Sequence, residues 1–172
     1  MSVDLAPDRS AQANDELEPD ASVPCALRQV ALVVMPFLMP YSPSIQLGLL
    51  KEIGASRGHA VRTLHLHLDF AAQIGRPRYE ALCERSGQIC EWLFALAAFG
   101  AQAPDQGSAM LDLMHKESLE SLTTAGLDRD CLLHIRQVEV PRYLDHLEAS
   151  VDWANFGVVG FSSCFEQNSA SF

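Results

Sequence analysis

Hydrophobic positions near the start of the chain form a β-loop-α pattern. A strand is predicted over 29–37, because its apolar residues fall on both faces, which is typical of a central parallel strand. A helix is predicted over 44–57, where leucine and isoleucine recur at helical spacing. Ser42 or Ser44 is available as its N-cap, and Gly58 is well placed to end it with a positive φ.

A second strand is predicted over 61–68 by strict alternation of leucines with polar residues. On such a strand His65 and His67 share one face with Asp69. Histidine pairs of this kind can hold a metal, but no third ligand is obvious nearby. Such a pattern more commonly belongs to a polar strand face that packs under a helix or loop or faces solvent. No metal ligand is therefore assigned.

Residues 71–137 have helical periodicity, and helices are predicted over 79–99, 108–123 and 128–137. Pro141 is predicted to open another helix that runs to 151. A third strand follows over 156–163, in which Gly160 indicates close approach of another backbone or a ligand. The sequence therefore predicts an α/β fold. Its sheet is Rossmann-like (flavodoxin-like), parallel and incomplete, with a long helical insertion between the second and third strands.

Composition bounds the number of domains and the kinds of partner. The chain has 172 residues, enough for one domain with a sizeable core. Its formal charge of −10, from 22 acidic and 12 basic residues, argues against nucleic acid as a partner. Residues 1–27 are strongly acidic and are predicted to be a disordered leader. Residues 28–172 form the α/β domain, with the helical insert at about 71–137.

Neither a membrane span nor a secretory signal is recognisable in the sequence, so no membrane partner is expected. The five cysteines are scattered along the chain and odd in number. Scattered cysteines of this kind are expected to remain thiols in a reducing compartment. The predicted localisation is therefore cytoplasmic.

Several common cofactor motifs are missing from the sequence. Neither a GxGxxG fingerprint nor a Walker sequence is present, which argues against hydride transfer and nucleotide hydrolysis. Cys83 and Cys90 are seven apart on a predicted helix and are expected to be small core residues rather than metal ligands. No three-cysteine run that could hold an iron–sulfur cluster occurs. No catalytic residue is assigned.

The predicted ligand-facing part of the fold is the edge where the parallel strands end. In open α/β sheets, ligands bind at the carboxyl ends of the strands. The proline-rich loop 36–44 follows the first strand, and a turn that carries Ser162, Ser163 and Asn168 follows the third. We expect both turns to lie at one rim of the sheet. A rigid turn and a helix cap are the alternatives that need no ligand.

Four segments carry a resemblance to a known family: MPFLMPYSPSIQLGLLKEIGASRGHAV, LHLHLDFAAQIG, EWLFALAAFG and WANFGVVGFSSCFEQNSAS. From about Gln29 onward the chain resembles the amino-terminal half of the cobalamin-binding radical S-adenosylmethionine (SAM) enzymes. Within that family it is most similar to the branch that matures ribosomally synthesised peptides (RiPP maturation), whose members are often C-methyltransferases.

The resemblance implies that the Rossmann-like domain binds cobalamin, and that a following barrel holds SAM and a [4Fe-4S] cluster. The loop after the first strand contains no histidine, so this cobalamin would lack a protein imidazole ligand from that loop. A precursor peptide is the expected partner of the full enzyme. Carried over residue by residue, the cofactor-binding positions are Pro36, Phe37, Leu38, Met39, Tyr41, Ser42, Ser44, Gln46, Ser162, Ser163, Cys164, Gln167 and Asn168.

The sequence departs from the family in lacking the barrel and its Cys-x-x-x-Cys-x-x-Cys motif. We therefore expect a truncated, metal-binding-type domain that cannot start radical chemistry alone. An alternative is a non-catalytic peptide- or partner-binding module derived from such an enzyme. In that reading, the segment 79–99 offers an apolar surface through Trp92, Phe94 and Phe99. The open sheet edge also predicts homo-oligomers.

Overall fold

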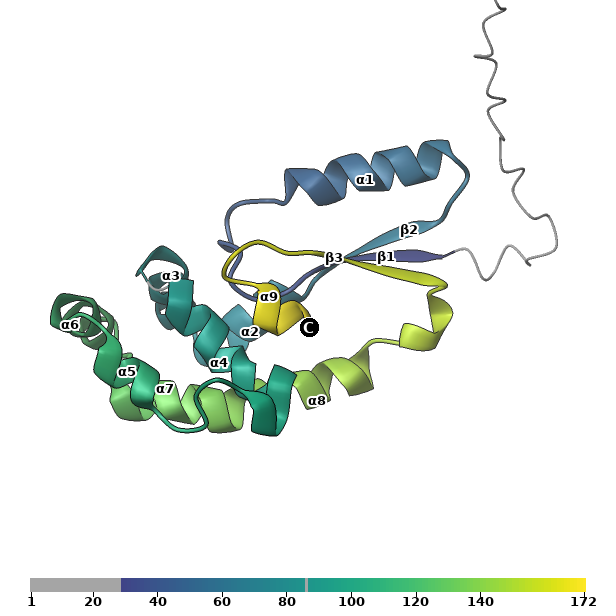
Figure 1. The fold of residues 1–172 in the computed structure, drawn as a ribbon. Helices are drawn as coiled ribbons and strands as arrows, with labels where there is room; N and C mark the ends of the chain where they lie inside the picture. Colours follow the sequence, from purple (N-terminus) through teal and green to yellow (C-terminus); the bar gives the residue numbers. More distant parts are fainter. Residues whose placement is uncertain (1–28, 86) are drawn as a thin grey trace, which may run out of the picture.

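A three-stranded parallel sheet organises the protein (Figure 1). The computed structural model describes residues 29–85 and 87–172; the predicted leader lies outside them. The strands are β1 (Val30–Val34), β2 (Val61–His65) and β3 (Val158–Ser162), in the order β2-β1-β3. Val30 is in register with Val61 on one side and with Val158 on the other. The predicted α/β class, with an incomplete Rossmann-like parallel sheet, is confirmed.

Helix α1 (Ile45–Ser56) covers one face of the sheet and has the predicted ends. The Ser44 hydroxyl accepts the N–H of Leu47 at 3.3 Å, so Ser44 is the N-cap. Gly58 adopts φ +80°, and the N–H of His59 reaches back to the carbonyl of Gly54 at 3.0 Å. This Schellman-type closure requires the left-handed conformation that glycine adopts without strain.

The predicted end of the second strand is wrong. β2 stops at His65, and helix α2 (Leu66–Ile74) begins at the next residue. Leu66, Phe70 and Ile74 are spaced four apart and are at most 5% exposed. The segment forms a helix because this conformation buries all three side chains on one face. His65 and His67 therefore do not share a strand face: His65 is exposed and His67 is buried.

The helical insertion contains more breaks than its periodicity predicts. The single helix expected over 79–99 is two helices, and the one over 108–123 is also two. Cys83 and Cys90 consequently lie on different helices rather than on one face of a single helix. The elements are α3 (Arg76–Arg85), α4 (Gly87–Phe99), the 3-10 turn η2 (Gly100–Gln102), α5 (Ala109–Leu113) and α6 (Lys116–Thr124).

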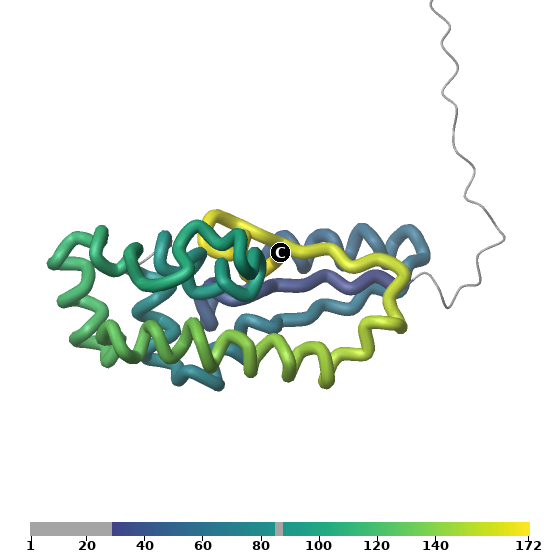
Figure 2. The backbone as a smooth tube through the Cα atoms, turned by 60° about the horizontal axis from the view of Figure 1, so that its bottom comes forward, coloured from purple at the N-terminus to yellow at the C-terminus, as the bar shows by residue number. Residues whose placement is uncertain are grey.

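A long helical rod leads back to the sheet, and it joins two helices that the sequence predicts as separate. Helix α7 (Arg129–His134), the π-helical segment η3 (Ile135–Glu139) and α8 (Val140–Ser150) are continuous (Figure 2). The N–H of Val140 bonds to the carbonyl of Ile135, five residues back. The wider π turn immediately precedes Pro141, which lacks an N–H and crowds the carbonyl four residues before it. Pro141 therefore lies in the first turn of α8, as predicted, but α8 continues the preceding helical segment without a break.

The core lies mainly between the sheet and the helical insertion. Five buried aromatic rings meet there with centroid separations of 5.0 to 6.4 Å: Phe37, Phe70, Tyr79, Phe94 and Tyr143. The opposite face is thinner: Leu32 and Val34 of β1 and Leu47 of α1 form a small buried cluster there. The chain then passes the 3-10 turn η4 (Trp153–Asn155) and ends in α9 (Asn168–Ser171).

Trp92 and Phe94 do not contribute to the exposed apolar surface expected over 79–99. Trp92 and Phe94 are 5% and 1% exposed, because both side chains belong to the core beneath the sheet. Only Phe99 is partly accessible, and its ring packs against Phe172 at 5.0 Å. Within residues 29–85 and 87–172, no helix is both long and apolar enough to cross a bilayer.

Candidate functional site

The turns after β1 and β3 meet at the carboxyl edge of the sheet, as expected for parallel neighbours. The Gln167 side chain donates a hydrogen bond through Nε2 to the carbonyl of Met35 at 2.7 Å. Gln167 is 3% exposed, so this bond joins the two turns in a buried setting. The expected juxtaposition is present, and its assignment to a ligand stays a prediction.

The loop after β1 is held by the helical insertion. Its backbone turns at Phe37, where φ is +81°, and the ring enters the core at 4% exposure. The N–H of Phe37 donates to the Tyr79 hydroxyl at 2.7 Å, and that hydroxyl donates to the carbonyl of Leu38 at 2.9 Å. Burial raises the pKa of Tyr79 far above its ordinary value, with a smaller contribution from Cys83, so the hydroxyl stays protonated and can donate.

The predicted cofactor positions divide by exposure. Pro36, Phe37 and Gln167 are buried, so their side chains support the fold rather than face the rim. The residues with accessible side chains define the surface that we call the rim. The half-buried members are Leu38, Met39, Ser44 and Ser162, and the exposed ones are Tyr41, Ser42, Gln46, Ser163, Cys164 and Asn168.

The turn after β3 is ordered by its own side chains and by one distant carboxylate. Ser163 Oγ donates to Asn168 Oδ1 at 2.9 Å, and Cys164 Sγ lies 3.2 Å from Gln167 Oε1. The carboxylate of Glu91 accepts the N–H groups of Asn168 and Ser169 at 2.9 and 2.8 Å, and the Ser169 hydroxyl at 2.5 Å. Glu91 therefore supplies the acceptors for the first turn of α9 from helix α4.

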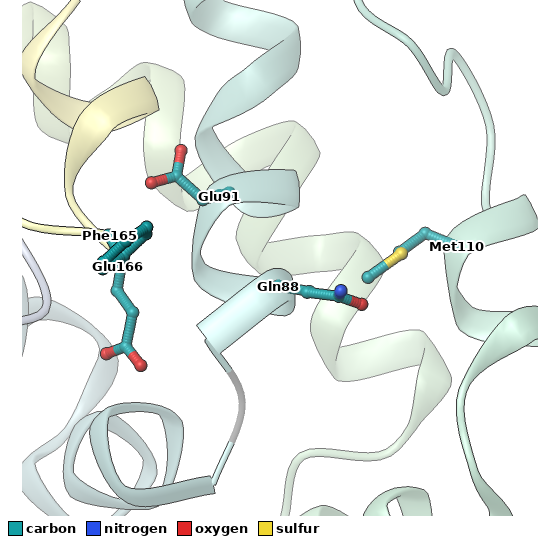
Figure 3. A pocket seen from close by; sticks show the side chains of 5 residues that line it. All are labelled: Gln88, Glu91, Met110, Phe165 and Glu166. Atoms are coloured by element: carbon teal, nitrogen blue, oxygen red, sulfur yellow. The ribbon is translucent and has the colours of Figure 1, made fainter.

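A pocket of about 600 Å³ lies between the turn after β3 and the helical insertion (Figure 3). Gln88, Glu91 and Met110 line it from the insertion, and Phe165 and Glu166 line it from the turn. Burial raises the pKa of Glu166, and the nearby Glu91 carboxylate raises it further. Sequence reasoning missed Glu91 and Glu166, because neither belongs to a local motif and only the fold brings them together.

His65, at the end of β2, and His67, in the first turn of α2, do not form the metal pair that strand geometry would have allowed. Their ring centroids are 5.9 Å apart and the ring planes are inclined at 69° to each other. Burial lowers the pKa of His67 to about 4, with a further contribution from His65, so its imidazole is neutral at pH 7. Nδ1 of His67 is buried without a hydrogen-bond partner. In the part of the chain that the structure describes, no three His, Cys, Asp or Glu side chains are grouped to hold a metal.

Comparison with known proteins found no matching family model, no matching curated protein and no matching solved structure. The chemistry of the rim therefore rests on its own residues and on the motif resemblance described above. Those residues place apolar groups from the first loop and hydroxyl groups from both turns at one edge of the sheet.

Proposed function

We propose that this chain is the cobalamin-binding portion of a radical SAM enzyme that modifies ribosomally synthesised peptides, most simply by methylation. The observation that supports it best is the meeting of the two turns at one rim, joined by the Gln167–Met35 hydrogen bond. Ligand sites of open parallel sheets occupy this edge. SAM and the [4Fe-4S] cluster would belong to the barrel domain that the resemblance implies for the full enzyme.

The donor set of the rim fits a corrin. This macrocycle is flat and apolar on its faces and carries amide groups around its periphery. Leu38, Met39 and Tyr41 offer apolar contact area, and Tyr41 is 60% exposed. Ser42 and Ser163 are exposed hydroxyls that can exchange hydrogen bonds with peripheral amides. When bound, methylcobalamin would supply the methyl group, while these residues orient it and exclude water from one face.

The rigidity of the first loop suits this role. The Tyr79 hydroxyl binds the backbone of Phe37 and Leu38 from the core side of the loop. These two hydrogen bonds restrain the position of the rim residues that follow. A preorganised surface loses less conformational entropy when a ligand binds. The loop contributes no imidazole, so in this proposal the cobalt has no histidine ligand from it.

Hydroxocobalamin retention tests the proposal. The chain is mixed with hydroxocobalamin and ultrafiltered, and corrin absorbance in the retained fraction is measured. Ser163→Trp places a large side chain on the rim and is expected to lower retention at least about ten-fold, or about 1.4 kcal/mol. Ser56→Trp is the matched control, because Ser56 is also exposed and also donates one local hydrogen bond, but lies in the last turn of α1.

Two results would contradict the cobalamin proposal. One is the absence of retained corrin with the unmodified chain at micromolar concentration. The other is equal retention by Ser163→Trp and Ser56→Trp, which would place the binding away from the rim.

A peptide- or partner-binding module is a second candidate, favoured by a stripe on α1. Ile45, Leu49 and Ile53 are spaced four apart and are 74%, 60% and 46% exposed. Fluorescence anisotropy of a labelled precursor peptide without cobalamin tests this reading. Leu49→Glu is expected to abolish binding while Ser163→Trp leaves it unchanged; the reverse result would refute this candidate.

A further inference from the structure

Strand β3 is an edge strand of the sheet, and the backbone N–H and C=O groups on its outer side can be identified from its pairing with β1. Within the described residues, β1 is the strand paired with β3. The N–H of Val158 bonds to the carbonyl of Gln29 at 3.3 Å. Parallel pairing uses every second residue of a strand, so Val158, Gly160 and Ser162 face β1. The N–H and C=O groups of Val159 and Phe161 therefore point away from the sheet.

This edge lacks the features that usually prevent strand pairing. Val158–Ser162 contains neither a charged residue nor a proline, although the whole chain carries a net charge of −10. Side chains on both faces of the strand are exposed: Val158 by 59%, Val159 by 36% and Phe161 by 46%. Natural edge strands are usually protected by charges, prolines or bulges. An uncharged strand that is apolar on both faces is typical of a sheet interior.

We infer that this edge pairs with β3 of a second copy of the chain, antiparallel, about a two-fold axis that passes beside Gly160. The two outward-facing residues, Val159 and Phe161, flank Gly160 symmetrically. In this register Val159 lies opposite the partner's Phe161, and each such pair exchanges two backbone hydrogen bonds. One axis therefore satisfies all the outward groups of both strands, which identifies a second copy as the occupant.

The side chains agree with this register. Val159 and Phe161 share the face of the sheet that carries Ala31 and Val33, because they are aligned with those residues in β1. An apolar β-branched residue opposite an aromatic one is a favourable cross-strand pair. At the axis, Gly160 lies opposite the partner's Gly160 in a non-hydrogen-bonded pair, whose Cα atoms approach to about 4.5 Å. The result is a continuous sheet across two copies, independent of cobalamin binding.

A disulfide at the axis tests the register directly. In a background with Cys25 and Cys164 replaced by serine, Gly160→Cys is expected to form an interchain disulfide under mild oxidation, because a Cα separation of about 4.5 Å suits the bond. The added Cβ would meet Leu32 Cδ2 at 3.4 Å, an ordinary contact, so the monomer tolerates it. Val158→Cys is the control: its partner copy would lie about 14 Å away, beyond disulfide reach.

Mass measurement in solution provides the second readout. Light scattering after size exclusion is expected to give twice the 18.9 kDa chain mass. Val159→Lys is expected to weaken the dimer at least about ten-fold in Kd, because an ammonium group replaces an apolar pair. Leu50→Lys makes the same kind of change on α1, at 49% exposure, and should leave the dimer intact.

The outcomes that overturn the inference are specific. They are a monomer at high micromolar concentration, equal cross-linking of Gly160→Cys and Val158→Cys, or a dimer unaffected by Val159→Lys. Circular dichroism of each variant shows whether it is folded, so that loss of the dimer is separated from loss of the fold.

Discussion

Replacing Tyr79 by Phe removes a single oxygen atom that joins the loop after β1 to helix α3. The Tyr79 hydroxyl accepts from the N–H of Phe37 and donates to the carbonyl of Leu38. Tyr79 itself is 0% exposed, and Phe37 is 4% exposed. The substitution keeps the ring in the aromatic cluster, so its effect reports the loss of the hydroxyl's hydrogen bonds, which include a contact with Cys83 besides the two to the loop.

The expected cost follows from these two bonds. Each contributes about 1 kcal/mol net, and a buried donor or acceptor left without a partner adds part of its desolvation penalty of about 1–3 kcal/mol. We therefore expect Tyr79→Phe to lower the free energy of unfolding by about 2–4 kcal/mol. Phe37 is a non-glycine residue with φ +81°, in the left-handed region. Loss of the hydrogen bond between its N–H and the Tyr79 hydroxyl allows the Phe37 backbone to relax.

Urea unfolding followed by circular dichroism measures this cost against a matched variant. Tyr143 is also 0% exposed in the same cluster, but its hydroxyl makes one bond, to the carbonyl of Leu66 at 3.0 Å. Leu66 lies in the first turn of α2, where the helix supplies its carbonyl with another donor. Tyr143→Phe should thus cost only about 1 kcal/mol. Equal losses for the two variants, or a larger loss for Tyr143→Phe, would refute the reasoning.

Three further predictions concern stability. His67 is neutral in the fold because its pKa is about 4 rather than 6.5, so the unfolded chain binds the extra proton and stability falls as pH drops below 6.5. The loss should reach about 2 kcal/mol at pH 5, and His67→Gln should remove it in urea titrations at pH 7 and 5. Leu47→Ala should lower the free energy of unfolding by about 2–4 kcal/mol, because Leu47 is the buried side chain of α1. Leu49 is exposed, so Leu49→Ala should cost less than about 0.5 kcal/mol. Similar losses for the two variants would contradict the packing of α1. Gln167→Leu should cost about 1–3 kcal/mol in the same assay by orphaning the Met35 carbonyl, and an unchanged midpoint would show that the turns are not coupled there.

Local signals predicted the first half of the fold well. The apolar run Val30–Val34 is β1, and both ends of α1 were predictable because Ser44 and Gly58 have conformational preferences that depend on few neighbours. The parallel sheet followed from strands separated by helical segments. The shared rim followed from the sheet being parallel, since all its strands end at the same edge.

Errors arose where two periods fit one segment or where distant residues decide. Residues 64–68 alternate like a strand, yet Leu66, Phe70 and Ile74 also fit a helix, and burial against the insertion selects the helix. Pro141 lies at the start of α8, as its local preference predicts, but no local pattern indicates the π turn that joins α8 to the preceding helix. The bonds made by Tyr79 and Glu91 span 41 to 78 residues, so no local pattern announces them.

The contacts that complete the carboxyl edge of the sheet have a consequence for how the polypeptide acquires its structure. Gln167 and Met35 are 132 positions apart, and α9 is tethered to Glu91 across 77 and 78 positions. Contacts of such long sequence separation slow the search for the native state. During translation the central strand β1 has one unpaired flank until β3 (Val158–Ser162) has been synthesised. Chaperone dependence and aggregation of nascent chains should therefore concentrate in that interval.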